Sequence, residues 1–352
     1  MLLIHTPSFA LAALSWLGTP PSEESALLLD ALKANPDAFG SILENADEHR
    51  LKIEVAVVVD GPDGPTLERH SIDRGPDYWY PASSVKTCAA IAAFVKLDRL
   101  GEDTGRPIDR DTPLRFLPLF DDETVDDADP SHLDGGMITA AHEARKVFLV
   151  SDNRGYNRLY ELAGNDVVND VMRDAGLSTC RIFHRLSEFR SPSDQLRVPA
   201  IELMDGEGET IASLPVRTSA FEETNADLDG ISIGTGHTTG DQVVDGPMSF
   251  ERKNYISLRD LQDMHVMLLR PDIAIDGASG FPISDGDRAF IAEAMASTPG
   301  ESKDPVYDRK AYPDDFSKFL LPGLLRFRKA DEVVVRDKVG RAYGFSTTNS
   351  EV

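Results

Sequence analysis

The stretch Tyr78-Trp79-Tyr80-Pro81-Ala82-Ser83-Ser84-Val85-Lys86-Thr87 decides how the rest of the chain is interpreted. It contains Ser-x-x-Lys, from Ser83 to Lys86, directly after a proline and just before an apolar run, residues 88–100. If that run is helical, positions i and i+3 share a face, and Ser83 Oγ lies within hydrogen-bond reach of Lys86 Nζ. A lysine desolvated at a helix N-terminus has a lowered pKa and can take the proton of a serine nucleophile. Such a motif occurs about once by chance in a chain of this length.

The length, composition and charge indicate a folded and strongly acidic globular protein. The chain has 352 residues, of which 41% are hydrophobic, and this is enough for one large domain or two ordinary ones. Its 36 Lys and Arg residues and 60 Asp and Glu residues give a formal net charge of −24. Nucleic acids and anionic membranes are bound through Lys and Arg patches, so we expect neither as a partner.

Residues 1–21 are expected to be a degenerate signal peptide or a disordered lead, with the folded domain following over residues 22–352. The apolar centre of the lead has no Lys or Arg before it and no clear cleavage site after it. The lead is too short and too interrupted to predict a membrane span. Cys88 and Cys180 are too few for a disulfide framework, and we expect two buried thiols rather than a bridge.

Periodicity and capping predict strands towards both ends and helices between them. The predicted helices are residues 22–48, capped by Ser22 and interrupted at Pro36, then 83–101, 137–150, 156–162, 167–174, 257–269 and 285–297. The predicted strands are residues 51–59, 66–72, a hairpin over 198–216, and 332–338. Residues 106–129 and 221–250 are predicted to be irregular.

This order predicts an α+β protein. Strands near the two chain ends must pair to be buried, which gives an antiparallel sheet lobe from about residues 22–80 and 300–352. A helical lobe, about residues 81–290, is inserted between them, with extra chain over about 191–250. A cleft between the two lobes is the natural place for a site.

Two further short motifs follow Ser83-x-x-Lys86 in the sequence. Ser151-Asp152-Asn153 precedes a predicted helix, and Lys338-Val339-Gly340 ends a predicted strand, where a glycine allows close approach of a ligand. A specified Ser-Asp-Asn is expected by chance in only about one in twenty chains of this length. Alone, the second motif is a helix cap and Lys338 a surface lysine, but the ordered trio favours a catalytic cleft.

With these three motifs the sequence resembles the serine β-lactamase-like and penicillin-binding protein superfamily, most closely class A β-lactamases. The resemblance runs over about residues 51–346. It includes the Tyr80-Pro81-Ala82-Ser83-Ser84-Val85-Lys86 context, the Ser151-Asp152-Asn153-Arg154 turn and the Ser257-Leu258-Arg259-Asp260 helix start. It implies the β-lactamase/transpeptidase-like arrangement of sheet and helical lobes and the hydrolysis of β-lactams through an acyl-enzyme.

The resemblance also implies roles for individual residues. Ser83 would be the acylated nucleophile, Lys86 its proton acceptor or relay, and Ser151 the group that passes the proton to the leaving nitrogen. Asn153 would hold the substrate amide and orient Lys86. The remaining roles fall on the third motif: Lys338 would bind the substrate carboxylate, and the backbone N–H groups of Ser83 and of a residue just after Gly340 would form the oxyanion hole.

The sequence departs from the class A pattern at the third motif and at the deacylating base. Val339 stands where the family usually has Thr or Ser, so a hydroxyl for the substrate carboxylate is missing. The Glu-x-x-Leu-Asn sequence of the base is absent. Glu188 lies 37 residues after Ser151, close to the family's spacing, and is either that base or a solvated loop residue. Without a base the acyl-enzyme forms and stalls.

The resemblance carries expectations about partners and location as well. The ligand would be a β-lactam or a peptidoglycan-like peptide, the protein would be an extracytoplasmic monomer, and no cofactor is implied. The chain stops at Val352, where the family normally continues through two strands and a helix, so we expect a short C-terminus. The alternatives are a penicillin-binding D,D-peptidase or esterase, and a pseudoenzyme that only binds such a peptide.

Other motifs give weaker indications. The sequence Gly234-Thr-Gly236-His-Thr-Thr-Gly240 lacks the Lys-Ser/Thr of a phosphate loop. His142-Glu143 has no second histidine at zincin spacing, and the eight histidines show no ligand cluster, so no metal is predicted. The acidic residues 121–129 do not match an EF-hand and are expected to be a solvated loop.

Overall fold

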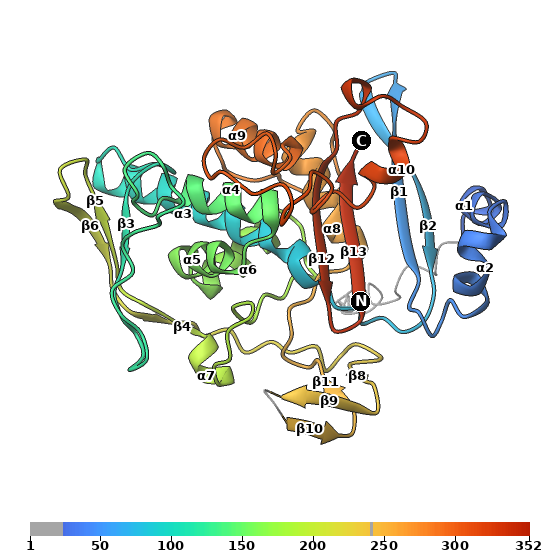
Figure 1. The fold of residues 1–352 in the computed structure, drawn as a ribbon, viewed down its shortest axis with the longest axis horizontal. Coiled ribbons are helices and arrows are strands. Elements are labelled where there is room, and N and C mark those ends of the chain that lie inside the picture. The colour runs from blue at the N-terminus through green and yellow to red at the C-terminus, as the bar shows by residue number, and fades with distance from the viewer. Residues whose placement is uncertain (1–23, 240–241) are drawn as a thin grey trace, which may run out of the picture. The chain divides into compact units, whose positions relative to one another are not determined.

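The computed structural model describes residues 24–239 and 242–352 (Figure 1). The chain separates into two compact units: one runs to Val59 and includes Leu67–Gly75, and the other contains Asp60–Thr66 and Pro76–Val352. The predicted lead and the Ser22 cap lie outside the described residues. None of the described helices combines the length and apolar character that a membrane crossing requires.

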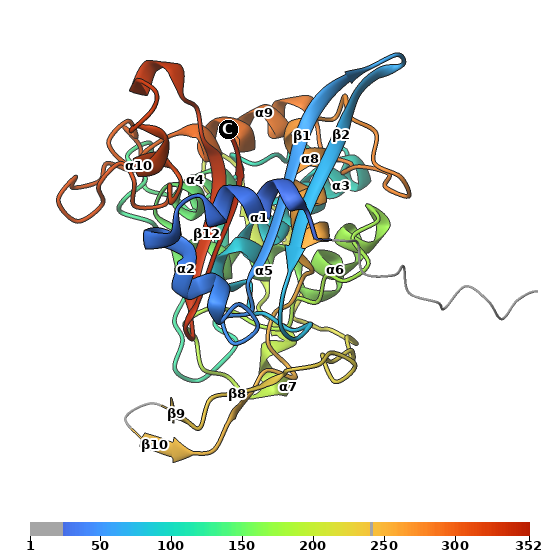
Figure 2. The same ribbon diagram turned by 90° about the vertical axis from the view of Figure 1, so that its right-hand side faces the viewer.

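The first unit contains two short helices and a hairpin (Figures 1 and 2). The elements are α1 (Ala26–Lys33), α2 (Pro36–Glu44), β1 (Lys52–Gly61) and β2 (Gly64–Asp73). Ser25 caps α1 by accepting a hydrogen bond from the Leu28 N–H, and its own N–H donates to Ser71 O at 2.9 Å, which ties the helix to β2. Pro36 starts α2, so the predicted helix is two helices.

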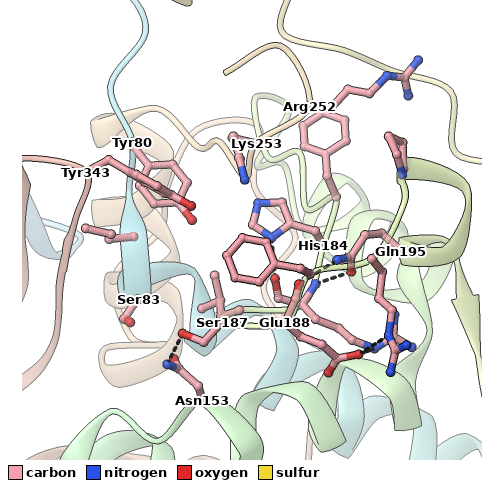
Figure 3. Close-up of a pocket in the computed structure, with 18 of the residues that line it drawn as sticks. Tyr80, Ser83, Asn153, His184, Ser187, Glu188, Gln195, Arg252, Lys253 and Tyr343 are labelled. Carbon is pink, nitrogen blue, oxygen red and sulfur yellow. Dashed lines mark hydrogen bonds and ion pairs between the residues drawn. The ribbon is translucent and has the colours of Figure 1, made fainter. Parts of the chain in front are cut away.

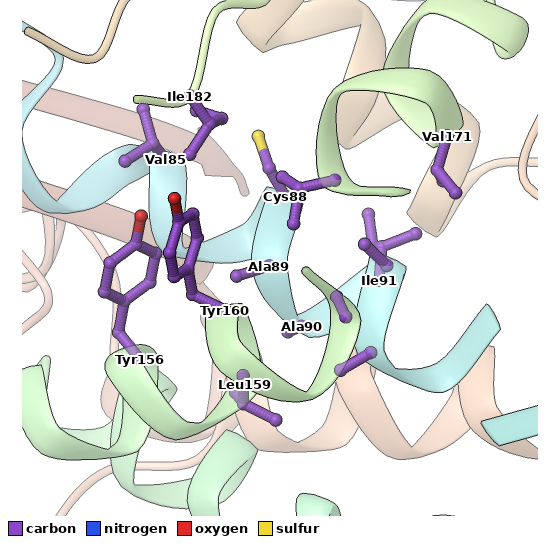
Figure 4. Close-up of a cluster of buried hydrophobic side chains, with 14 of the residues drawn as sticks. Val85, Cys88, Ala89, Ala90, Ile91, Tyr156, Leu159, Tyr160, Val171 and Ile182 are labelled. Atoms are coloured by element: carbon purple, nitrogen blue, oxygen red, sulfur yellow. The ribbon is translucent and has the colours of Figure 1, made fainter. Parts of the chain in front are cut away.

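The second unit has its helices around one buried helix, α3 (Lys86–Thr104), which follows the 3-10 turn η1 (Ala82–Val85). The others are α4 (Ala140–Val150), α5 (Asn153–Ala163), α6 (Asn165–Asp174), α7 (Pro192–Gln195), α8 (Leu258–Leu269), α9 (Asp285–Ala296), α10 (Leu321–Leu324) and the 3-10 turn η2 (Ala330–Glu332). Every residue from Lys86 to Val95 is buried. Small side chains such as Ala89 and Ala90 let α5 and α6 pack closely on α3 (Figure 4).

The predicted end of α3 at Gly101 is wrong. The helix continues to Thr104 and ends at Gly105, whose φ of 63° is the left-handed C-terminal conformation. Gly101 serves packing instead, because a Cβ there would lie 3.0 Å from the Ile108 carbonyl oxygen. Both cysteines are buried free thiols, as predicted, with Cys88 on α3 and 3.6 Å from the Met264 sulfur.

Short strands cover part of the second unit, and they include some that the sequence did not predict. The predicted 198–216 hairpin is confirmed as β5 (Ile201–Met204) and β6 (Thr210–Leu214), but β3 (Leu114–Phe116) joins it in the order β3-β5-β6. The remaining pairs are β4 (Arg197–Val198) with β7 (Arg217–Thr218), β8 (Ser232–Ile233) with β11 (Met248–Ser249), and β9 (Gly236–Thr239) with β10 (Gln242–Asp245). The irregular segments predicted at 106–129 and 221–250 therefore contain strands, which at two to four residues are too short to show a period.

The C-terminal hairpin is formed by β12 (Arg336–Ala342) and β13 (Phe345–Glu351), with Gly340 opposite Thr347. The predicted strand over 332–338 is thus shifted towards the C-terminus, and β13 was missed because its sequence is polar. Tyr343 (φ 52°) and Gly344 (φ 82°) form the two-residue turn, both with the positive φ that suits the twist of a hairpin.

These elements make an α+β protein with antiparallel sheets, as the sequence predicted. The first hairpin, β1–β2, and the last, β12–β13, each form a two-stranded sheet in the described ladders. One sheet built from both chain ends, and one domain over residues 22–352, stay predictions.

Candidate active site

Ser83 lies in η1, at the turn that leads into α3, and is partly exposed. The turn is held by Ser84 Oγ, which donates to Pro81 O at 2.7 Å, and Ala82 adopts a positive φ of 49°. A Cβ at position 340 would lie 2.6 Å from the Ser83 nitrogen and 2.8 Å from Pro81 O. Glycine at 340 therefore lets the backbone of β12 lie directly against the Ser83 N–H, where the resemblance places the oxyanion hole.

An aromatic cluster fixes the turn of the last hairpin over this region. The Tyr343 ring lies 5.3 Å from the Tyr80 ring and 5.5 Å from the Phe250 ring, in edge-to-face contacts. Tyr80 comes just before Pro81 in the chain, so this packing holds the Ser83 turn and β12 together. Of the cluster, the sequence singled out only Tyr80, because Tyr343 and Phe250 lie far from it in the chain.

Lys86 is completely buried, and its ammonium group is bound by the second motif. Lys86 Nζ donates to Asn153 Oδ1 at 2.6 Å, to Asp152 O at 3.2 Å and to Ser151 O, and it lies 3.3 Å from Ser151 Oγ. Burial lowers the pKa of Lys86 well below its usual value, and the charge of Lys338 lowers it further, against the opposing effect of Asp152. Burial thus favours the neutral amine, the form that a general base requires.

The bond that the sequence predicted between Ser83 and Lys86 is not formed. Within the described residues, no hydrogen bond joins Ser83 Oγ to Lys86 Nζ, because the amine binds the Ser151–Asn153 segment instead. Catalytic contacts are often long in a free enzyme and tighten on binding, so this geometry is compatible with Lys86 as a base.

The second motif is held between two helix ends. Ser151 ends α4 in the left-handed conformation, with φ 58°, and Asp152 caps α5 by accepting a hydrogen bond from the Gly155 N–H at 2.6 Å. The two caps present Ser151 and Asn153 to Lys86. Asn153 joins two parts of the site, since its Oδ1 accepts from Lys86 and its Nδ2 donates to Ser187 Oγ at 2.7 Å.

Lys338 is buried and approaches Ser151 from the opposite side. Its Nζ donates to Ser151 Oγ at 2.9 Å and to Val339 O at 3.0 Å. Burial lowers the pKa of Lys338 to about 7, although the neighbouring Asp337 favours the charged form. Asp337 itself pairs with buried Lys318 at 2.9 Å. The ammonium of Lys338 is thus directed at Ser151 rather than at open space for a substrate carboxylate.

A buried ionic network supports the second motif from behind. Arg158 binds Asp126, Asp129 at 2.9 Å and Glu143 at 2.8 Å, and Lys146 binds Asp129. The prediction that residues 121–129 form a solvated acidic loop is wrong for Asp129, which is buried. Asp129 can be buried because Arg158 and Lys146 compensate its charge, and neither cation is near it in the sequence.

Glu188, the candidate deacylating base, lines the cavity of Ser83 but is engaged by other side chains. The Glu188 carboxylate accepts from Arg190 Nε at 2.9 Å and from Asn157 Nδ2 at 3.4 Å. The side chain that meets Asn153 is the neighbouring Ser187, which adopts a positive φ of 55° (Figure 3). A hydroxyl therefore occupies the position beside Asn153 that a carboxylate base would need.

The cavity beside Ser83 has a volume of about 560 Å³ and is lined by residues of the first and second motifs (Figure 3). Ser83, Asn153, Ser187 and Glu188 line it, and so do residues of the extra chain at 191–250, including Phe221 and Ser249. Cationic side chains are also part of the wall: Arg252, Lys253 and Arg341. In the described ranges none of these three forms an ion pair with a carboxylate. Sequence analysis missed them, since isolated basic residues carry no motif.

Comparison with known proteins identifies the family. The model of a family described as "Beta-lactamase enzyme family" matches residues 71–274, more than half of the chain. The chain therefore belongs to the beta-lactamase enzyme family, which supports a hydrolase. The matched span contains Ser83, Lys86 and Ser151–Asn153 but ends before Lys338, whose place in the site rests on its contact with Ser151.

The chain is also similar to solved structures. One is a crystal structure of a beta-lactamase from Sphaerobacter thermophilus, with a TM-score of 0.41, 14% identity, and coverage of 89% of this chain and 82% of that chain. Another is a beta-lactamase from Burkholderia vietnamiensis, with a TM-score of 0.39, 12% identity, and coverage of 87% and 78%. At these scores the likenesses add nothing to the family assignment. The comparison with curated proteins found no match.

A first prediction concerns Gly340. The substitution Gly340→Ala puts a methyl group against the Ser83 nitrogen and pushes β12 away from the turn. Because small misplacements of reacting groups cost about 100-fold in rate, we expect acylation of Ser83 to slow by about that factor. Stopped-flow acylation kinetics measure it, and Gly323→Ala in α10 is the control, since a Cβ there meets nothing within 4 Å and its φ is not positive. Equal rates in Gly340→Ala and the wild type would contradict the assigned contact.

A second prediction concerns pH and Lys338. Its pKa is about 7 in the folded protein and about 10.4 in the unfolded chain, so the unfolded state binds more protons between these values. The contribution of Lys338 to stability is therefore lost as the pH falls through 7 and recovered as it rises towards 10. We expect Lys338→Met to reduce the gain in Tm between pH 7 and pH 9. Lys310→Met, on an exposed side chain, should leave that gain unchanged; an unchanged gain in Lys338→Met would refute the assignment.

Proposed function

We propose that the protein is a serine hydrolase, similar to class A β-lactamases, that is acylated at Ser83 by a β-lactam or a related amide or ester and releases the acyl group slowly. The observation that carries this proposal is the buried Lys86 amine, held by Ser151 and Asn153 behind a partly exposed Ser83 at a cavity of about 560 Å³. Family membership supports the hydrolase; the serine mechanism rests on this geometry.

The contacts define a path for the proton. Ser83 Oγ attacks the carbonyl carbon and its proton goes to the neutral Lys86 amine, whose pKa burial has lowered. Ser151 Oγ accepts a hydrogen bond from Lys338 and lies 3.3 Å from Lys86 Nζ, so its own hydrogen is free for the leaving nitrogen. As that nitrogen takes the Ser151 proton, the proton held on Lys86 replaces it. The positive charge of Lys338 stabilises the oxygens of Ser83 and Ser151 when they carry negative charge during these proton transfers.

The cavity wall indicates an anionic substrate. With Lys338 directed at Ser151, Arg252, Lys253 and Arg341 are the lining cations without an ion pair among the described residues, and Glu188 and Glu251 also line the cavity. In a protein with a net charge of −24 these cations form a local attraction for a carboxylate, as β-lactams and peptide C-termini carry. Val339 is buried and has no hydroxyl with which to bind a substrate carboxylate. We therefore assign carboxylate binding to the cations of the cavity wall.

Slow release of the acyl group follows because neither Glu188 nor Ser187 is able to act as the deacylating base. The Glu188 carboxylate is occupied by Arg190 and Asn157, and Ser187 beside Asn153 has a hydroxyl that cannot accept a proton at neutral pH. This observation favours the second candidate function, a penicillin-binding D,D-peptidase or esterase. A pseudoenzyme that only binds a peptide would share the cavity but would not be acylated.

A third prediction tests acylation. Incubation with a fluorescent penicillin should add the mass of one intact penicillin to the chain, and the adduct should be absent in Ser83→Ala. Ser41→Ala, at an exposed serine of α2, should still be labelled. Intact-mass spectrometry and gel fluorescence give the readout, with a chromogenic cephalosporin to follow turnover. A chain that acquires no adduct and shows no turnover is the pseudoenzyme.

A fourth prediction concerns release of the acyl group. A carboxylate at position 187 would lie beside Asn153, and general bases contribute about 100- to 10,000-fold. We expect Ser187→Glu to speed loss of the adduct by about 100-fold or more. The matched Ser187→Gln variant has the same size without the charge and should not do so. If instead Glu188→Gln abolishes turnover in the otherwise unchanged protein, Glu188 is the base and release is not limited in the way proposed.

A further inference from the structure

Outside the candidate active site, the fold brings together two histidines and a carboxylate that lie far apart in the sequence. His132 precedes α4, His142 is in the first turn of α4, and Asp304 follows α9. One ligand atom from each lies within 4.8 Å of the others. The sequence indicated no histidine cluster, and the structure corrects that: the partner of His142 is ten residues earlier, at a spacing that no zinc motif uses.

Hydrogen bonds fix which nitrogen of each ring is free. His132 Nδ1 lies 2.7 Å from Met137 O, and because a carbonyl only accepts, Nδ1 carries a hydrogen; in the neutral ring Nε2 then keeps its lone pair. That lone pair is 3.6 Å from Asp304 Oδ2. Donation of the second ring nitrogen to a backbone carbonyl is the usual way in which proteins orient a metal-binding histidine.

The same reasoning applies to His142, whose side chain is fully buried. Ser131 Oγ gives its single hydrogen to Asp129 Oδ1 at 2.7 Å, so at 2.9 Å it must accept from His142 Nε2–H. His142 Nδ1 therefore keeps its lone pair. This buried atom has no hydrogen-bond partner among the described residues and lies 3.6 Å from Asp304 Oδ1.

With both imidazoles neutral, three electron-pair donors face one another without a hydrogen between them. A buried cluster of acceptors is costly unless a cation compensates it, and an unpaired buried group in a native protein requires such an explanation. Asp304 is already held in place, since its Oδ1 accepts from the Leu133 N–H at 2.9 Å. The cluster is therefore preorganised for a positively charged ligand.

We propose that His132, His142 and Asp304 form a binding site for one divalent transition-metal ion, of which Zn²⁺ fits best. Two imidazoles and one carboxylate are a ligand set of zinc sites, in which a fourth position stays open. Bond lengths of about 2.0–2.2 Å place tetrahedral ligand atoms about 3.3–3.5 Å apart. Both observed nitrogen–oxygen separations are 3.6 Å, close to this spacing. The two rings are stacked with centroids 4.3 Å apart, so the imidazoles would turn towards each other's edge to share the ion.

A second cavity gives the ion a way in and a fourth ligand from solvent. His132 and Asp304 line a hollow of about 410 Å³, and four more acidic side chains surround it. These are Asp111, Asp134, Glu293 and Glu301. Arg145 and Lys303 line the hollow as well, but the acidic groups outnumber them, and a wall of net negative charge raises the local concentration of cations. The site is separate from the cavity at Ser83, with which it shares no lining residue.

Bound there, the ion would connect the start of α4 to the segment after α9. The same segment reaches the other end of α4, where Ser317 Oγ donates to Leu149 O at 3.0 Å. Since α4 ends at Ser151, the metal would stabilise the helix that supports the second motif. The ion has no part in the acylation chemistry proposed above, and its binding can be measured independently of activity.

The fifth prediction uses the full chain stripped with a chelator and titrated with Co²⁺, followed by competition with Zn²⁺. We expect one ion per chain by elemental analysis, visible d–d absorption bands of four- or five-coordinate Co²⁺, and a higher Tm with either metal. His132→Gln and Asp304→Asn should weaken binding by more than about 100-fold, since changes even outside a ligand set cost about 10- to 100-fold. His49→Gln, on an exposed histidine, is the control.

Asp304→Asn is the decisive variant, because its amide oxygen can still accept from the Leu133 N–H and its fold is checked by circular dichroism. A wild-type chain that binds no stoichiometric ion would overturn the proposal. So would binding that persists unchanged in Asp304→Asn and His132→Gln, which would place the ion elsewhere on the acidic surface. Loss of binding in both folded variants, with His49→Gln unaffected, supports the site.

Discussion

The burial of one lysine amine constrains the whole site. Lys86 enters α3 with no exposed surface, so its Nζ must be satisfied by hydrogen bonds or lose its charge. The acceptors come from the Ser151–Asn153 segment, which can supply them only because it lies between the end of α4 and the start of α5. Packing of α5 on α3 and the chemistry at Ser83 therefore depend on the same contacts.

The surroundings of Lys338 change the role that its motif predicts. Lys338 was expected to bind a substrate carboxylate, yet its amine meets Ser151 Oγ, the hydroxyl that also lies beside Lys86. The charge of Lys338 lowers the pKa of Lys86, and a cation beside the Ser151 hydroxyl favours its oxygen when that oxygen becomes anionic. Recognition of an anionic substrate then falls to the cations of the cavity wall, which belong to no motif.

The acidic groups of this chain differ in their burial and in how their charge is compensated. Most acidic groups remain near the surface, but Asp129 and Glu143 are buried behind the second motif, where Arg158 and Lys146 compensate them. Removing one partner from such a network costs about 3–5 kcal/mol, because it leaves a buried charge uncompensated. At Asp304 no cation takes this part among the described residues, and two histidines stand there instead, which is the basis of the proposed metal site.

The sequence by itself determined the local elements and the order of the motifs. Helical and strand periods, the caps and the Ser83, Ser151 and Lys338 motifs are properties of neighbouring residues, and they predicted the α+β class and the nucleophile. The tertiary structure decided which side chains meet: Ser187 rather than Glu188 beside Asn153, and His132 with His142 and Asp304. Hydrogen bonding and charge compensation act through space over a few ångströms, so partners separated by tens of residues leave no periodic signal in the chain.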